Sequence, residues 1–465
     1  MRRFLLTAVV ALIVRAPLHA QPLPGTKPLE MQGDLAKQMV EGIDRYLTRE
    51  TTASVDKRKD YWKPDYTSSA AYDKSITPNR ERLKKILGVV DGRLPVNMEY
   101  ANDAGHPPLV GQGGNYKVFA ARWTVLPGVD AVGLVLLPKD KPNACIVVIP
   151  DADQTPEQLA GLAPGLPDTA QTARVLAESG CVVMAPTLIN RQDTWSGSSK
   201  LNRFTNQTHR EFIYRMSYEM GRHVIGYEIQ KVLAAVDWFA QDKDHPPIGV
   251  YGHGEGGLLA LYSAAVDTRI TSTVVSGHFG PRENLHDEPI YRNVWGLLKE
   301  FGDGEIMRLI VPRGLTIEQA AFSAEQPPAA RAGRGGAAPG MASSPPLKAT
   351  MAEFNRILQT LPALETFPRK SLRLAVPKES GKKHATARNF LIELAGIAPP
   401  DEDLAPPKVL KLHDPDNRQK RQFDQLVDYT QKLMPDAVQR RKAFVWDKLD
   451  TSSLDKFKKS QEPLR

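Results

Sequence analysis

The chain has 465 residues, of which 41% are hydrophobic and 25% charged, a composition that indicates a globular protein and excludes collagen-like, disordered and multi-span membrane chains. Its formal net charge is +8 at pH 7, and because the first twenty residues hold three arginines and no acid, the remainder carries +5. So small an excess, without a basic tract interleaved with aromatic residues, argues against nucleic-acid binding.

Residues 1–20 are predicted to be a signal peptide. Arg2 and Arg3 precede the apolar run Phe4–Val14, and Leu18-His19-Ala20 ends in a small residue before Gln21. The apolar run is too short to cross a bilayer, which needs about 20 residues. We therefore expect a secreted or periplasmic protein with no membrane attachment after the signal is removed. Export would permit a disulfide, but Cys145 and Cys181 both open apolar runs and are interpreted as buried hydrophobic residues.

Residues 21–114 are predicted to form a helical N-terminal preface. Leu35, Met39, Ile43 and Leu47 are spaced by four and mark one helix face. Pro78-Asn79 is expected to introduce a second helix that ends near Gly88.

Residues 115–400 are predicted to form one domain in which strands and helices alternate. A hairpin turning at Pro127-Gly128 comes first, and the long helix 222–240 carries an apolar stripe. The strands are expected at 117–125, 131–137, 144–149, 181–185, 248–251, 270–275, 315–317 and 372–376. This alternation predicts an α/β fold with a mostly parallel sheet of about eight strands, covered by helices on both faces.

Two further segments differ in composition from this domain. Residues 325–347 are rich in Ala, Pro, Gly and Ser and are expected to be a mobile surface insertion. Residues 401–465 are expected to be a charged helical tail that packs poorly on the core. Its few large apolar residues are Leu426, Tyr429, Leu433, Phe444 and Trp446.

The turn Gly252-His253-Gly254-Glu255-Gly256-Gly257 falls between a predicted strand and a predicted helix. Two mechanisms use such a turn. A nucleophile elbow, G-x-S-x-G, presents a serine on a strained backbone. A dinucleotide fingerprint, G-x-G-x-x-G, lets the backbone approach a pyrophosphate, and Gly252, Gly254 and Gly257 match it.

The position of the turn favours a nucleophile elbow in which glycine, at position 254, stands in place of the nucleophilic serine. A dinucleotide fingerprint belongs to the first βα unit and needs an acid about 20 residues further on. Here at least four predicted strands precede the turn, and the place of the acid is held by Ser276-Gly277-His278. Dinucleotide binding through the three glycines is therefore the weaker interpretation.

The chain resembles the α/β-hydrolase superfamily, near its dienelactone-hydrolase and acetyl-xylan-esterase branch. The resemblance rests on the hairpin 123–138, on Ile149-Pro150-Asp151-Ala152-Asp153 and its continuation to Pro156, on 226–232, on the glycine-rich turn and on 288–294. The resemblance covers residues 60–400. Over this range the chain is similar to large exported bacterial proteins, whose long members continue into a second hydrolase domain.

This resemblance implies an incomplete catalytic triad. The nucleophile position falls on Gly254, the acid on Glu318 and the histidine on His384, in the chain order that such folds use. The implied oxyanion donors are backbone N–H groups at Glu255 and at Asp151 or Ala152.

We therefore expect a weak or inactive hydrolase that binds a small ester or carbohydrate-derived ligand, and a serine introduced at position 254 is expected to restore some activity. No cofactor is expected, and no metal site, because the histidines lack a paired ligand spacing. One alternative is an active esterase with another nucleophile, for example a serine of Ser196-Gly197-Ser198-Ser199. The other is the accessory half of a larger enzyme, partnered by a second hydrolase.

Overall fold

The computed structural model describes residues 23–102, 105, 107–322, 324–362, 371–376, 384–399 and 405–465, and the predicted signal peptide lies outside them. The chain divides into two compact units, residues 1–50 and 51–465, and the sheet lies wholly in the second. Helix α1 (Leu35–Lys57) begins in the first unit and confirms the predicted helix. Its apolar face is exposed rather than buried, since Leu35, Met39, Ile43 and Leu47 all remain accessible.

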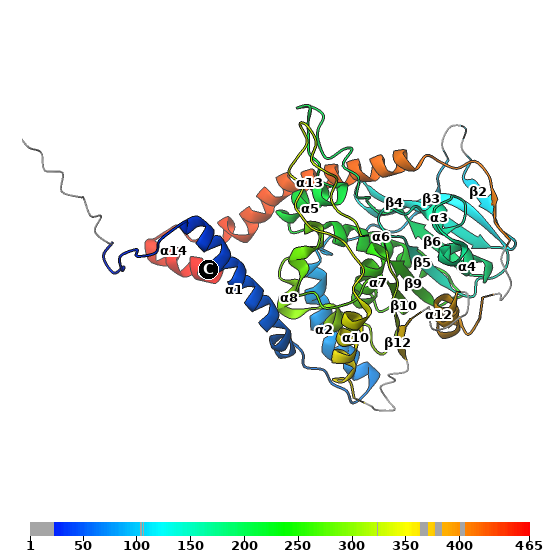
Figure 1. Cartoon of the computed structure of the whole chain (residues 1–465), viewed down its shortest axis with the longest axis horizontal. Coiled ribbons are helices and arrows are strands. Elements are labelled where there is room, and N and C mark those ends of the chain that lie inside the picture. The colour runs from blue at the N-terminus through cyan, green and yellow to red at the C-terminus, as the bar shows by residue number, and fades with distance from the viewer. Residues whose placement is uncertain are drawn as a thin grey trace, which may run out of the picture. The chain divides into compact units, whose positions relative to one another are not determined.

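The second unit is built on an eleven-stranded sheet (Figure 1). Its six strands from β12 to β6 run parallel, and the neighbours from β6 onward pair antiparallel. In sheet order the strands are β12 (Leu372–Ala375), β11 (Gly314–Glu318), β10 (Ile270–Ser276), β9 (Ile248–His253), β5 (Cys145–Ile149), β6 (Val182–Pro186), β4 (Val129–Pro138), β3 (Tyr116–Leu126), β2 (Leu109–Gln112) and β13 (Lys408–Val409), with β1 (Met98–Tyr100) also paired to β3.

The eight predicted strands are all present in the large sheet, which contains three further short strands. Two others, β7 (Gly197–Ser198) and β8 (Arg203–Phe204), form a separate two-stranded sheet. Strands β1 and β2 fall in the expected preface, and β13 falls in the expected tail. Strands of two to four residues carry too little alternation to be identified from sequence. Parts of the expected preface and tail thus belong to the same compact unit as the sheet.

Helices cover both faces of the sheet, as predicted, because alternate residues of each strand point to opposite faces. In β5, Cys145, Val147 and Ile149 join one apolar cluster, whereas Ile146 and Val148 join the other. The helices are α2 (Ser69–Ile86), α3 (Pro156–Leu159), α4 (Thr172–Glu178), α5 (His209–Tyr218), α6 (Val224–Phe239), α7 (Glu255–Val266), α8 (Leu297–Glu300), α9 (Asp303–Arg308), α10 (Leu347–Leu358), α12 (Ala385–Ala395), α13 (Pro415–Phe444) and α14 (Leu454–Gln461).

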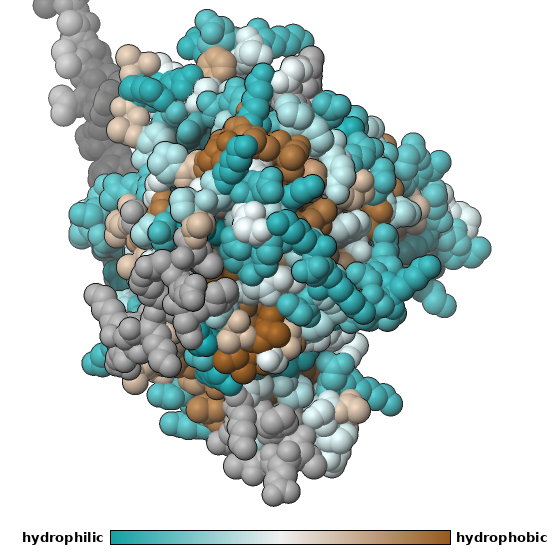
Figure 2. Space-filling model, turned by 90° about the vertical axis from the view of Figure 1, so that its right-hand side faces the viewer, coloured by the Kyte–Doolittle hydropathy of each residue, from teal (hydrophilic) through white to brown (hydrophobic). Residues whose placement is uncertain are grey.

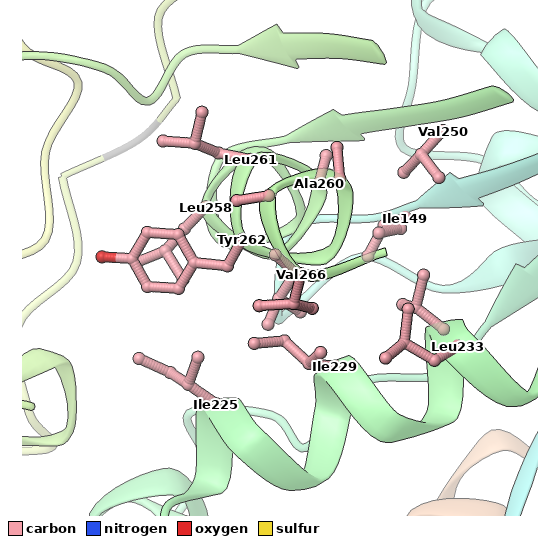
Figure 3. Close-up of a cluster of buried hydrophobic side chains, with 14 of the residues drawn as sticks. Ile149, Ile225, Ile229, Leu233, Val250, Leu258, Ala260, Leu261, Tyr262 and Val266 are labelled. Carbon is pink, nitrogen blue, oxygen red and sulfur yellow. The ribbon is translucent and has the colours of Figure 1, made fainter. Parts of the chain in front are cut away.

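The larger cluster centres on the packing of α6 against α7 and the strands beneath them. Figure 3 shows Ile225 and Ile229 of α6 directed toward α7, where Tyr262 and Val266 lie, and Leu233 of α6 nearer to Ile149 of β5. All six side chains are at most 3% exposed. The predicted apolar stripe of this helix is thereby confirmed.

Helix α2 begins earlier than predicted, at Ser69 rather than at Pro78. The side chain of Ser68 accepts the N–H of Ala71 at 3.0 Å and caps the helix. Pro78 lies within the helix.

The expectation that the tail packs poorly is wrong for α13 as far as Leu433. Phe423, Leu426, Tyr429 and Leu433 are buried in the larger cluster, because they recur at helical spacing on one face. Phe444, near the end of the helix, is 63% exposed. The helix as far as Leu433 is therefore part of the core.

The insertion 325–347 contains no regular strand among its described residues, only the bridges Glu325↔Ala342 and Arg331↔Arg334. Several hydrogen bonds connect it to the rest of the unit. Asn206 donates from Nδ2 to the carbonyl of Pro328 at 2.7 Å and accepts the N–H of Ala337 at 3.0 Å.

The surface and the cysteines agree with a well-formed core. Figure 2 shows a mostly hydrophilic face with apolar side chains gathered in scattered patches. Cys145 and Cys181 are free thiols and both are buried, as predicted. Burial raises the pKa of each to about 12, so both thiols are protonated at neutral pH.

Candidate functional site

The glycine-rich turn joins β9 to α7 at the centre of the parallel strands, where the sequence predicted an elbow. Gly254 has φ +57° and ψ −118°, a backbone conformation that L-residues with a side chain rarely adopt. Its N–H donates to the carbonyl of Ser276 at 3.0 Å, which ties the turn to the end of β10. Gly256 is also required, because a Cβ there would collide with the carbonyls of Ile149 and Pro150.

The space above Gly254 is occupied by the side chain of Asp151. A Cβ added at position 254 would lie 2.9 Å from Cγ of Asp151 and closer still to Oδ1. The same Oδ1 accepts the backbone N–H of Glu255 at 2.8 Å. One carboxylate therefore stands where a nucleophile would stand, and it takes the N–H that an oxyanion would need.

The second implied oxyanion donor is also engaged. The backbone N–H of Asp151 donates to Oε1 of Gln154 at 3.1 Å. Ala152, the alternative, is buried at 1% exposure. A pyrophosphate at this helix N-terminus would meet the Asp151 carboxylate, which argues against dinucleotide binding at the three glycines.

Arg191, in the loop after β6, holds Asp151 in place. Its two terminal nitrogens lie 2.7 and 3.0 Å from the Asp151 oxygens, and one of them also contacts Asp153 at 2.9 Å. Burial alone would raise the pKa of Asp151, but hydrogen bonds from Arg191 and its charge outweigh burial and lower it. Asp151 is therefore an ionised, fixed carboxylate at neutral pH.

Glu255 is the centre of a buried ionic network. Its side chain is inaccessible to solvent and contacts Arg292 at 2.9 Å, Arg210 at 3.2 Å and Arg191 at 3.4 Å. Burial would raise the pKa of Glu255, yet the three guanidinium groups lower it. Arg210 in turn pairs with Glu228 at 2.8 Å. This network fixes the start of α7 and the position of Asp151.

A cavity of about 550 Å³ opens beside the turn, at the carboxyl ends of β5, β9, β10 and β11. Ligands bind at this edge of open α/β sheets. Its polar and aromatic lining consists of Asp151, Asp153, Gln154, Thr169, Thr172, Tyr251, His253, Ser276, Glu318, Phe322 and Glu325.

Of the three implied triad positions, only Glu318 is among the described residues that line the cavity. Glu318 ends β11, lines the cavity and accepts the hydroxyl of Tyr251 at 3.2 Å. Gly254 lies beneath Asp151. His384 stands before α12 with φ +52° and is absent from the described residues that line the cavity. Residues 377–383, which precede it, lie outside the described part of the chain.

A serine–histidine pair that sequence reasoning missed also lines the cavity. Oγ of Ser276 lies 3.0 Å from Nδ1 of His253, and the two residues face each other in the register of β10 and β9. Burial lowers the pKa of His253, against the opposing charges of Asp151 and Glu318, so the imidazole is neutral at pH 7. The alternative serines, Ser196, Ser198 and Ser199, are absent from the described residues that line the cavity.

Two other histidines are buried in fixed tautomers. Nε2 of His209 accepts the N–H of Trp195 at 3.0 Å, and Nδ1 of His223 accepts the N–H of Ile225 at 3.0 Å. Burial lowers the pKa of each to about 4. Within the described residues, no group of three or more His, Cys, Asp or Glu side chains is arranged to hold a metal ion.

The chain is similar to known hydrolases. The model of the dienelactone hydrolase family matches residues 132–292, which include β5, β9, the glycine-rich turn and α7. The chain has the α/β-hydrolase fold. "Putative hydrolase YtaP" of Bacillus subtilis is 34% identical over 109 residues, which are 22% of this chain and 36% of that protein. The match thus spans about a third of that relative's length.

The chain is also similar, at low identity, to solved structures of esterases. One is a "putative acetyl xylan esterase" from Bacteroides fragilis, 15% identical, covering 85% of this chain and 95% of that one with a TM-score of 0.47. Another is a glucuronoyl esterase from Solibacter usitatus, 15% identical, covering 67% and 89% with a TM-score of 0.41. Among the described residues, no helix has the length and apolarity that crossing a bilayer requires.

Proposed function

We propose that this α/β-hydrolase-fold protein binds a small ester or carbohydrate-derived ligand in the cavity beside the glycine-rich turn, and that position 254 takes no part in hydrolysis. The cavity has the size of small-molecule sites, which span roughly 300–1,000 Å³. The resemblance to esterase folds supports this class of ligand.

The observation that carries the proposal is the placement of the Asp151 carboxylate. Hydrolysis at an elbow needs a nucleophile whose proton a base can take and free donors for the oxyanion. Gly254 supplies no nucleophile, and Asp151 occupies both its space and the N–H of Glu255. Arg191 holds this carboxylate through hydrogen bonds to both of its oxygens.

The lining suits hydroxyl-rich, uncharged ligands. Asp153, Glu318 and Glu325 present carboxylate groups that accept hydrogen bonds from hydroxyls. Phe322 and Tyr251 supply aromatic surface in the same cavity. An anionic ligand would be repelled, because no lysine or arginine is among the described residues of the lining.

Titration calorimetry with neutral and acetylated xylo-oligosaccharides tests this proposal. We expect binding that Glu318→Gln weakens at least about tenfold, through loss of an acceptor worth about 1.5 kcal/mol. Glu81→Gln, which changes an exposed carboxylate on α2, should leave affinity unchanged. Absence of binding to every neutral sugar and ester, or equal affinity in Glu318→Gln, would contradict the proposal.

The role of position 254 is tested through the histidine that would serve it. His384→Ala should leave any hydrolysis of 4-nitrophenyl acetate unchanged, as should His286→Ala, which alters a histidine whose side chain is 60% exposed. Loss of turnover in His384→Ala alone would show that an elbow-type triad operates.

Export is a further part of the proposal. The basic start, the apolar run 4–14 and the small residue Ala20 support a cleaved signal peptide. Sequencing of the N-terminus of the protein from its native host should give Gln21. A mature chain that retains Arg2 and Arg3 would contradict cleavage.

A further inference from the structure

The cavity holds a nucleophile–base pair that is independent of position 254. Ser276 is the last residue of β10 and His253 is the last residue of β9, so the parallel register brings their side chains together on adjacent strands. Oγ of Ser276 and Nδ1 of His253 are 3.0 Å apart. This separation is the hydrogen-bond reach that defines an activated nucleophile and its base.

We propose that Ser276 is the nucleophile and His253 the general base of a hydrolytic dyad that acts on small uncharged acyl esters. Both residues line the cavity of about 550 Å³, so a bound acyl group has access to the pair. The inference rests on the proposed ligand site but requires neither Gly254 nor His384.

The reaction proceeds through an acyl-enzyme. Ser276 Oγ attacks the ester carbonyl carbon while its proton passes to Nδ1 of His253, and an Oγ–C bond forms. The C–O bond to the alcohol then breaks, and His253 returns the proton to the leaving oxygen. A water molecule, deprotonated by His253, then attacks the acyl carbon. The Oγ–C bond breaks, His253 returns the proton to Oγ of Ser276, and the acid is released. The sum is ester plus water giving acid plus alcohol.

The surroundings of His253 suit this role. The imidazole is neutral at pH 7 because burial lowers its pKa. The carboxylates of Asp151 and Glu318 lie close enough to favour the imidazolium that forms during attack. Phe322 packs edge-on against the ring, with centroids 6.4 Å apart.

Gln154 is the donor that we assign to the developing oxyanion. Its Oε1 accepts the N–H of Asp151, so Nε2 is the end that donates, and the residue lines the same cavity. A side-chain amide serves as an oxyanion donor in other hydrolases. The N–H of Glu255, which would serve at an elbow, is taken by Asp151.

Active-site labelling of the whole protein tests the dyad without any substitution. The native protein is incubated with an alkyl fluorophosphonate, and the adduct is mapped by peptide mass spectrometry. We expect one adduct, on Ser276, that forms more slowly when 4-nitrophenyl acetate is present. No adduct, or an adduct on another serine, would overturn the proposal.

Kinetics on matched variants give the second test. Ser276→Ala and His253→Gln should each lower kcat for 4-nitrophenyl acetate about 10²-fold or more, whereas Ser198→Ala should not change it. Calorimetric binding of neutral sugars should persist in Ser276→Ala, so failure of the dyad is distinguishable from failure of the ligand site. Wild-type turnover in Ser276→Ala, with its melting temperature unchanged, would overturn the dyad.

Discussion

A serine placed at position 254 is a direct test of how the turn is built. The sequence alone suggested that Gly254→Ser would restore some hydrolysis. The structure reverses this expectation, because the new Cβ would enter the space of the Asp151 carboxylate. We now expect Gly254→Ser to lower the free energy of unfolding and to give no new esterase activity.

The magnitude follows from two contributions. A residue with a side chain at φ +57° and ψ −118° costs about 1–3 kcal/mol in backbone strain. Displacing Asp151 separates it from Arg191, and breaking a buried ion pair costs about 3–5 kcal/mol. The loss is thus about 4–8 kcal/mol, against a typical total of about 5–15 kcal/mol for a folded domain.

Urea unfolding of three variants separates these contributions. Gly254→Ala should lose about as much stability as Gly254→Ser, because the collision begins at Cβ. The double variant Gly254→Ser with Asp151→Ala should regain part of the loss, since Arg191 keeps Asp153 and Glu255 as partners. Unfolding of Gly254→Ser within about 1 kcal/mol of wild type would refute this account of the Asp151 carboxylate.

Three further predictions concern stability. The folded pKa values of His209 and His223 lie near 4, below the unfolded value of 6.5. The stability that the two histidines contribute is therefore complete above pH 6.5, and about 3 kcal/mol for each is lost as the pH falls to 4. The midpoint of urea unfolding should fall over the same pH range, and His209→Gln or His223→Gln should reduce that fall. The same fall in both variants would contradict the prediction. Leu426→Ala should cost about 2–5 kcal/mol and Phe444→Ala less than about 0.5 kcal/mol, and equal losses in thermal melts would contradict the burial of α13. Glu255→Gln should cost about 3–5 kcal/mol in urea unfolding, and a neutral effect would contradict its role in the ionic network.

The parts of the fold that were predictable are those encoded within short stretches. The apolar run of β5, the stripe on α6 and the glycines of the turn each identify their element without reference to distant residues. Position 254 as the tip of the turn was predictable for the same reason. The short strands β1, β2 and β13 were not, because they form only where neighbouring strands supply their partners.

The site itself was less predictable, since it depends on residues far apart in the chain. Asp151 and Glu255 are 104 positions apart. The sequence indicated the backbone N–H of Asp151 as an oxyanion donor, and nothing around it indicated that its carboxylate would accept the N–H of Glu255. The pairing of Ser276 with His253 follows from strand register, which is decided by the whole sheet. Glu318 was identifiable because it ends a strand.

The docking of α13 on β4 also bears on when the protein can finish folding. Gln425 of α13 contacts Asp130 of β4 across 295 positions of sequence. During synthesis the β3–β4 hairpin leaves the ribosome before the helix that covers it, because 295 positions separate the two contacting residues. The part of that hairpin that α13 covers therefore stays exposed until the helix follows, and chains that still lack α13 expose a surface that favours association with chaperones or with one another.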